Sequence, residues 1–193
     1  MLKRITLAAA ALAIGLPGLA APKYLDDSHQ RLWDSLEASG VSAHVNPREV
    51  CGNPRVNVMG LYTYNPHMNR SLMAICQDFR NQNTLEETVW TNNDLDTLRH
   101  ESIHYLQDCL DGNKDLTLSP IFDGPGGLSP VDGDYSDVID GLGREAANRI
   151  AYRYQRRGAD SRTIRLEHEA FYLASEVPAE DIAATIDLAC KPR

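Results

Sequence analysis

Residues 94–110 read DLDTLRHESIHYLQDCL. Apolar residues recur in this stretch at helical spacing, and they are Leu95, Leu98, Ile103, Leu106 and Leu110. Asn92, Asn93 and Asp94 are good N-cap residues, and Asp111-Gly112 is a suitable stop. The pattern predicts an α-helix over residues 94–110 with one apolar face.

Two histidines on this helix are placed to bind a metal ion. His100 and His104 lie four residues apart, so both imidazoles project from the same face, about one turn apart. That spacing lets two ring nitrogens reach one zinc ion. Glu101 adjoins His100 and is placed to take a proton from a metal-bound water. A surface helix with two incidental histidines is the structural alternative, because so short a motif also arises by chance.

A catalytic zinc ion needs a third protein ligand, and residues 105–110 contain no further histidine. The segment 166–171, LEHEAF, is the best source. Glu167 falls on the apolar side of its predicted helix, where a carboxylate needs a cation to offset its desolvation. Glu169 falls on the side of Arg165, with which it would form a surface pair. We therefore predict Glu167 as the ligand and keep Glu169 as the alternative.

His100-Glu101-x-x-His104, followed by a helical Glu167-x-x-Ala170, resembles the gluzincin branch of the zincin metallopeptidases. The resemblance covers roughly residues 56–176 in the order of elements. It implies one zinc ion per chain, a peptide or protein substrate and Glu101 as general base. The ligands that it implies are His100, His104 and Glu167.

Several further expectations concern the surroundings of this site. Some gluzincins carry an Asp where this chain has Phe171, so the support of the first histidine must differ. The strand 71–79 resembles the edge strand along which zincins bind an extended peptide. An oxyanion donor besides zinc is needed, and no choice is made among Tyr152, Tyr154, Tyr172 and His168. Asp108 is a candidate to orient a ligand imidazole. Surface or turn positions are expected for the other histidines, His29, His44 and His67.

The order of the predicted elements gives an α+β fold class. A helix over 26–38 and a short strand over 41–45 come first, and strands 56–64 and 71–79 then form a hairpin through the turn-forming residues 65–69. The active-site helix and a long loop, 113–134, come next. Helices are expected over 135–157, 161–176 and 179–189. We predict a small antiparallel sheet, the active-site helix and a C-terminal helical part, as in zincins.

The N-terminus has the pattern of a secretory signal. Basic residues at 3–4 precede an apolar run over 5–16 and small residues over 17–21. The apolar run is shorter than the ~20 residues that cross a bilayer, so no stable membrane anchor is expected after cleavage. We predict a signal peptide over residues 1–20, one zincin-like catalytic domain over 21–193, and a secreted or periplasmic protein.

Four cysteines follow the signal, and they are Cys51, Cys76, Cys109 and Cys190. An even number in an exported chain predicts two disulfides, with three possible pairings. Cys76 could instead be the third metal ligand, as in peptide deformylases, but an oxidising compartment favours the disulfide.

The charge balance argues against a nucleic-acid partner. The formal net charge is −8, and loss of Lys3 and Arg4 with the signal changes it to about −10. The one basic cluster, Arg153, Arg156 and Arg157, is interpreted as the last turns of a helix before Gly158. The functional alternative to a peptidase is an exported, non-catalytic zinc-binding or interaction domain that keeps the histidine helix.

Overall fold

The computed structural model describes residues 25–52, 58–65, 70–81, 83–110, 118–122 and 134–190. The expected signal peptide, His67 and most of the expected loop over 113–134 lie outside the described residues.

Three strands form a small mixed sheet. They are β1 (Val41–Val45), β2 (Gly60–Asn65) and β3 (Arg70–Ile75), and their spatial order is β1-β3-β2. The expected hairpin is present, because β2 and β3 pair antiparallel. The strand β1 pairs with β3 in parallel, so the sheet is mixed and not wholly antiparallel. Since β3 lies in the centre, the prediction that this strand is an edge was wrong, and β2 is an edge among the described strands.

Seven helices in the described part of the chain complete an α+β fold, which confirms the predicted class. They are α1 (Asp27–Ala38), α2 (Arg48–Cys51), α3 (Asn92–Cys109), α4 (Tyr135–Leu142), α5 (Arg144–Gln155), α6 (Ser161–Glu176) and α7 (Ala179–Ala189). The single helix predicted over 135–157 is in fact α4 and α5. Gly143 separates them with a φ of 75°, a conformation that glycine adopts at little cost.

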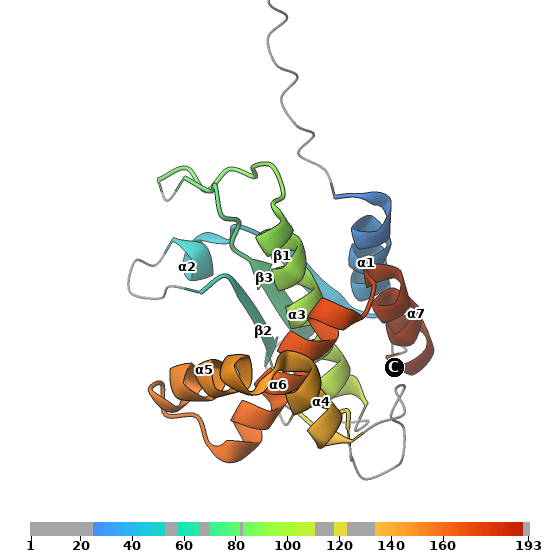
Figure 1. The fold of residues 1–193 in the computed structure, drawn as a ribbon. Helices are drawn as coiled ribbons and strands as arrows, with labels where there is room; N and C mark the ends of the chain where they lie inside the picture. The colour runs from blue at the N-terminus through green and yellow to red at the C-terminus, as the bar shows by residue number, and fades with distance from the viewer. Residues whose placement is uncertain are drawn as a thin grey trace, which may run out of the picture.

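The helix α3 is the centre of the molecule. It contacts β2 and β3 on one side and α6 on another, while α1 and α7 lie side by side (Figure 1). The helices α4 and α5 pack against α6. The core consists of buried apolar side chains, most of them from α1, α3, β3, α6 and α7, among them Leu32, Leu36, Leu98, Ile103, Leu106, Met73, Ile75, Leu173, Ile182 and Ile186.

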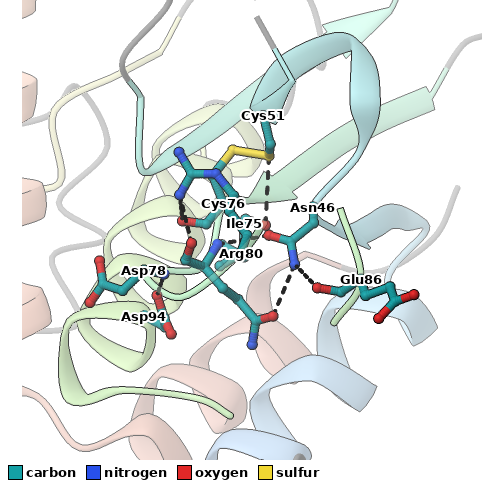
Figure 2. Close-up of a disulfide and its surroundings, with 9 residues drawn as sticks. Asn46, Cys51, Ile75, Cys76, Asp78, Arg80, Glu86 and Asp94 are labelled. Carbon is teal, nitrogen blue, oxygen red and sulfur yellow. Dashed lines mark hydrogen bonds between the residues drawn. A yellow bond between two sulfur atoms is a disulfide. The ribbon is translucent and has the colours of Figure 1, made fainter. Parts of the chain in front are cut away.

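Hydrogen bonds fix the N-terminal end of α3 against the sheet. Thr91 and Asp94 form a reciprocal capping box, in which each side chain accepts a backbone N–H of the other residue. The buried Asp94 carboxylate also accepts the backbone N–H of Asp78, just beyond β3, at 2.8 Å (Figure 2). The start of the helix is therefore fixed to the end of the central strand.

Two disulfides are present, as expected. Cys51–Cys76 joins α2 to the residue after β3 (Figure 2), and Cys109–Cys190 joins the ends of α3 and α7. Disulfides persist in an extracellular or other oxidising compartment. Cys76 is thereby excluded as a thiolate ligand. Within the described residues, none of the helices has both the length and the apolar character needed to span a bilayer.

Candidate metal centre

The two histidines of α3 converge on one point. The Nε2 atoms of His100 and His104 are 3.1 Å apart, and both side chains are almost entirely buried. One turn of helix separates them, as the four-residue spacing requires. Both ring nitrogens therefore face the same small volume.

Glu167 of α6 approaches the same point from the neighbouring helix. Its Oε2 atom is 3.3 Å from Nε2 of His100, and its Oε1 atom is 3.5 Å from Nε2 of His104. Tetrahedral ligands ~2.0–2.1 Å from a zinc ion lie about 3.3–3.4 Å from one another. The three residues can hold a metal ion, and no other group of this kind occurs within the described residues.

The electrostatics of the cluster favour a bound cation. Burial lowers the pKa of His104, but the carboxylates of Glu167 and Glu101 outweigh it and raise that pKa to about 9. Burial raises the pKa of Glu167, but its contacts with His100 and His104 hold it well below its usual range. The cluster therefore attracts positive charge, which a proton or a metal ion can supply.

Gln107 determines which nitrogen of His104 faces the cluster. The Nε2 group of Gln107 donates to the carbonyl of Leu166 at 3.1 Å and to Glu169 Oε2 at 3.2 Å. Its Oε1 atom is therefore left to accept from His104 Nδ1, at 2.7 Å. With the proton on Nδ1, the lone pair of Nε2 points towards the cluster, which is the tautomer that binds a metal there. Gln107 was missed by sequence reasoning, although it lies three residues after His104 on the same face.

His100 has a different environment. Its ring packs on Phe171 with ring centroids 4.4 Å apart, and its Nδ1 atom has no hydrogen-bond partner among the described residues. Phe171 thus lies beside the first histidine, where some gluzincins have an Asp. Here packing on Phe171, and not a carboxylate at Nδ1, supports this side of the ring.

Glu101 is buried beside the cluster but does not belong to it. Burial raises the pKa of its carboxyl group, while His100 and His104 act in the opposite direction. The backbone N–H of Tyr62 in β2 donates to the carboxylate. Gly60 makes this approach possible, because a Cβ atom there would lie 2.5 Å from Glu101 Oε1 and 2.7 Å from its Cγ. The strand β2 and the helix α3 together hold Glu101 in place.

Glu169 is not the surface residue that its position near Arg165 predicted. It is fully buried, and its Oε2 atom accepts the backbone N–H of Ile121 at 2.8 Å as well as the amide of Gln107. The helical projection was wrong because residues 118–122 cover this side of α6. Glu169 therefore supports Gln107 and does not reach the metal cluster.

The remaining candidates lie apart from the cluster. Asp108 accepts from the Tyr62 hydroxyl at 2.5 Å, and Gln107 orients the imidazole instead. The His168 ring contacts the Tyr135 hydroxyl and the carbonyl of Ala147. His29, expected at a surface or turn position, is instead buried within α1, where it bonds to the N-cap residue Asp26. His44 is exposed, as expected, and bonds to Ser42.

A cleft of about 370 Å³ adjoins the cluster. It reaches His100 and Glu101 and is bounded by β2, α3, α5 and α6; its wall includes Gly60, Tyr154, Phe171 and Ala174. Burial and the negative charge of Glu167, to which the Tyr154 hydroxyl hydrogen-bonds, raise the pKa of Tyr154 far above its usual value. Its hydroxyl therefore stays protonated beside the metal cluster. Tyr152, by contrast, is largely exposed, and the Tyr172 ring packs on Phe122.

Comparison of the chain with protein-family models, with curated proteins and with solved structures finds no match in any of the three.

Proposed function

We propose that this chain is an exported zinc-dependent peptidase, made as a signal peptide over residues 1–20 and one catalytic domain over residues 21–193. The observation that carries the proposal is the convergence of His100, His104 and Glu167 at zinc-ligand spacing, with Glu101 buried beside them. Two nitrogens and one carboxylate form the ligand set of many catalytic zinc sites, which leave a fourth position open.

Zinc held by these three residues would lower the pKa of a bound water and polarise the substrate carbonyl. Glu101 is the general base that takes a proton from the attacking water. As the C–N bond breaks, the same carboxyl group returns that proton to the leaving amine nitrogen. A buried carboxyl group with a raised pKa suits both steps, because a pKa closer to neutral pH lets the group both accept and release a proton.

Tyr154 is the best placed of the four oxyanion candidates. Its hydroxyl is protonated, borders the cleft and lies beside Glu167. We assign it the hydrogen bond to the carbonyl oxygen as negative charge develops there, for which its single O–H turns from Glu167 to that oxygen.

The strand β2 suits a peptide substrate. It lies at a sheet edge in the described part of the chain, and its first residue, Gly60, lines the cleft. An extended peptide can pair with such an edge through backbone hydrogen bonds. The role of substrate-binding edge strand, which the sequence assigned to β3, is therefore proposed for β2, because β3 lies in the centre of the sheet.

Metal content and hydrolysis of an unfolded protein, measured on the same samples, test the proposal. The mature protein should contain about one zinc per chain, and Glu167→Ala should lose most of it. Glu169→Gln, which keeps an acceptor for Gln107, is the matched control and should retain the metal. Glu101→Gln should retain zinc and lose hydrolysis by about 10²-fold or more.

The outcomes separate the competing functions. Equal hydrolysis by Glu101→Gln and the unaltered protein would refute the mechanism. Zinc bound through Glu167 without hydrolysis of any unfolded protein would favour the non-catalytic zinc-binding domain. Absence of zinc even after remetallation would refute both.

A further inference from the structure

Two arginine side chains line the cleft beside the metal cluster. Arg153 lies in the last turn of α5, and Arg157 lies four residues later, just beyond the end of that helix. Both are exposed, and both lie on the same wall as Tyr154. Arg157 is close to the site's chemistry, since its guanidinium carbon is 5.9 Å from the centroid of the Tyr154 ring.

Neither arginine has an anionic partner among the described residues. The arginines that do form ion pairs there are Arg99 with Asp96, Arg149 with Glu145 and Arg165 with Glu169. Asp96 also lines the cleft, but its charge is matched by Arg99. Arg153 and Arg157 therefore present two positive charges to the cleft without an ion-pair partner in the described part of the chain. The other acidic lining residue, Glu101, is buried beside the metal cluster, and the formal net charge of the whole chain is −8.

The end of a helix alone does not account for this placement. Cations near a helix C-terminus are favoured by the helix dipole, and that explanation suffices for Arg156. Arg156 lies between the other two in sequence, yet it is not among the cleft residues, and its guanidinium carbon is 5.9 Å from the centroid of the Tyr152 ring. Arg153 and Arg157 differ from it because they face the cleft.

Other parts of the cleft lining are apolar. Val58 and Met59 precede β2, while Phe171 and Ala174 come from α6. A ligand that fills this cleft meets apolar side chains and a pair of guanidinium groups. Guanidinium groups bind carboxylates through paired, charge-assisted hydrogen bonds.

We propose that Arg153 and Arg157 form a carboxylate-binding subsite, so that the preferred substrates are peptides with a carboxylate close to the scissile bond. The proposal rests on the proposed peptidase function. The carboxylate has two possible sources, an acidic side chain or the C-terminus of the peptide. An acidic protein repels acidic peptides at long range, and a local cationic pair overcomes that repulsion at the cleft.

The experiment compares three peptides of one apolar sequence with the zinc-loaded protein. The first has blocked ends and Gln at a single position, the second has Glu at that position, and the third keeps Gln but has a free C-terminal carboxylate. Separate sets of these three peptides place the Gln or Glu residue at different positions along the sequence. With the unaltered protein, kcat/KM should be roughly five- to tenfold higher for an anionic peptide than for the blocked Gln peptide. The preference should decrease as the salt concentration rises.

Three variants identify the residues responsible. Arg153→Gln combined with Arg157→Gln should bring the ratio to about one, whereas Arg156→Gln, which removes the same kind of charge outside the cleft, should leave it unchanged. Arg153→Glu combined with Arg157→Glu should shift the preference to a peptide with Lys in place of Glu, which simple loss of helix stability would not do. Preference for the second or the third peptide identifies the source of the carboxylate.

Binding of the same peptides to the Glu101→Gln protein, measured by fluorescence anisotropy, separates this proposal from the peptidase proposal. Tighter binding of an anionic peptide without cleavage by the unaltered protein would support the subsite and refute the peptidase. Cleavage with equal rates for all three peptides, or a preference that survives in the double Gln variant, would refute the subsite and leave the peptidase proposal intact.

Discussion

At the scale of single residues, the contact with the most direct effect on the candidate metal centre is the one between Gln107 and His104. Gln107→Leu removes the acceptor for His104 Nδ1, so the imidazole loses the partner that fixes its tautomer. We expect zinc affinity to fall about 10- to 100-fold. Competition with a chromophoric chelator measures this affinity. Gln107→Glu keeps an acceptor at this position and should lose less; equal affinities for all three proteins would show that the contact does not tune the metal.

A second prediction at this scale concerns Gly60. Gly60→Ala places a methyl group against the Glu101 carboxylate, so that side chain must move. Displacement of a general base by about 1 Å should reduce kcat by about 10²-fold. Zinc content should remain near that of the unaltered protein, because Glu101 is not a ligand. Leu61→Ala, the next residue along β2, is the control; a similar loss in it would attribute the effect to strand damage instead.

The three members of the candidate metal cluster could be predicted from the sequence, but the residues that orient them could not. His100 and His104 follow from spacing on one helix, and Glu167 follows from its apolar neighbours. The positions of Gln107 and Glu169 depend on residues 118–122, whose backbone N–H at Ile121 bonds to Glu169 from outside the helix. A projection of one helix contains no information about a segment that packs across it.

At the scale of elements, the N-cap of α1 predicts a pH effect on stability. Burial opposes ionisation of Asp26, but hydrogen bonds from the backbone and ring of His29 outweigh it and lower the pKa of Asp26 from 3.8 to about 2. The resulting stability is nearly complete above about pH 5 and is lost as the pH falls through about 4 to about 2, so that little of it remains at pH 2. Asp26→Asn should therefore be less stable than the unaltered protein at pH 6, by about 0.5 kcal/mol because the side chain is largely exposed, and equally stable at pH 2. Urea unfolding with a chelator present measures both values, and a difference that is constant with pH would contradict the assignment.

The helices whose bounds were predicted most accurately are those with a clear capping residue or proline at an end. The helices α6 and α7 have the predicted bounds, Ser161–Glu176 and Ala179–Ala189, because Asp160 caps the first and Pro178 precedes the second. The break at Gly143 was missed because glycine also occurs inside helices, so its presence alone does not mark an end. That break matters for the site, since it allows α5, with Arg153 and Tyr154, to leave the direction of α4.

At the scale of the whole molecule, the cysteine pairing could not be predicted, since three pairings fit the sequence equally well. Cys109 and Cys190 are neighbours only because α7 packs against α3 and α1. Their bond joins α3, five residues beyond His104, to the end of the described chain. The other bond, Cys51–Cys76, joins α2 to the residue that follows β3.

The two disulfides should stabilise the fold to different extents. The sequence separations are 81 for Cys109–Cys190 and 25 for Cys51–Cys76. Loss of chain entropy in the unfolded state then contributes about 4.5 kcal/mol for the longer loop and about 3.5 kcal/mol for the shorter one. Urea unfolding of Cys109→Ala/Cys190→Ala should accordingly show a larger loss of stability than that of Cys51→Ala/Cys76→Ala. The opposite order would contradict the loop-length argument. It would show that native packing around Cys51 contributes more to stability than loop length does, and that the packing of α7 on α3 holds α3 in place without the covalent bond.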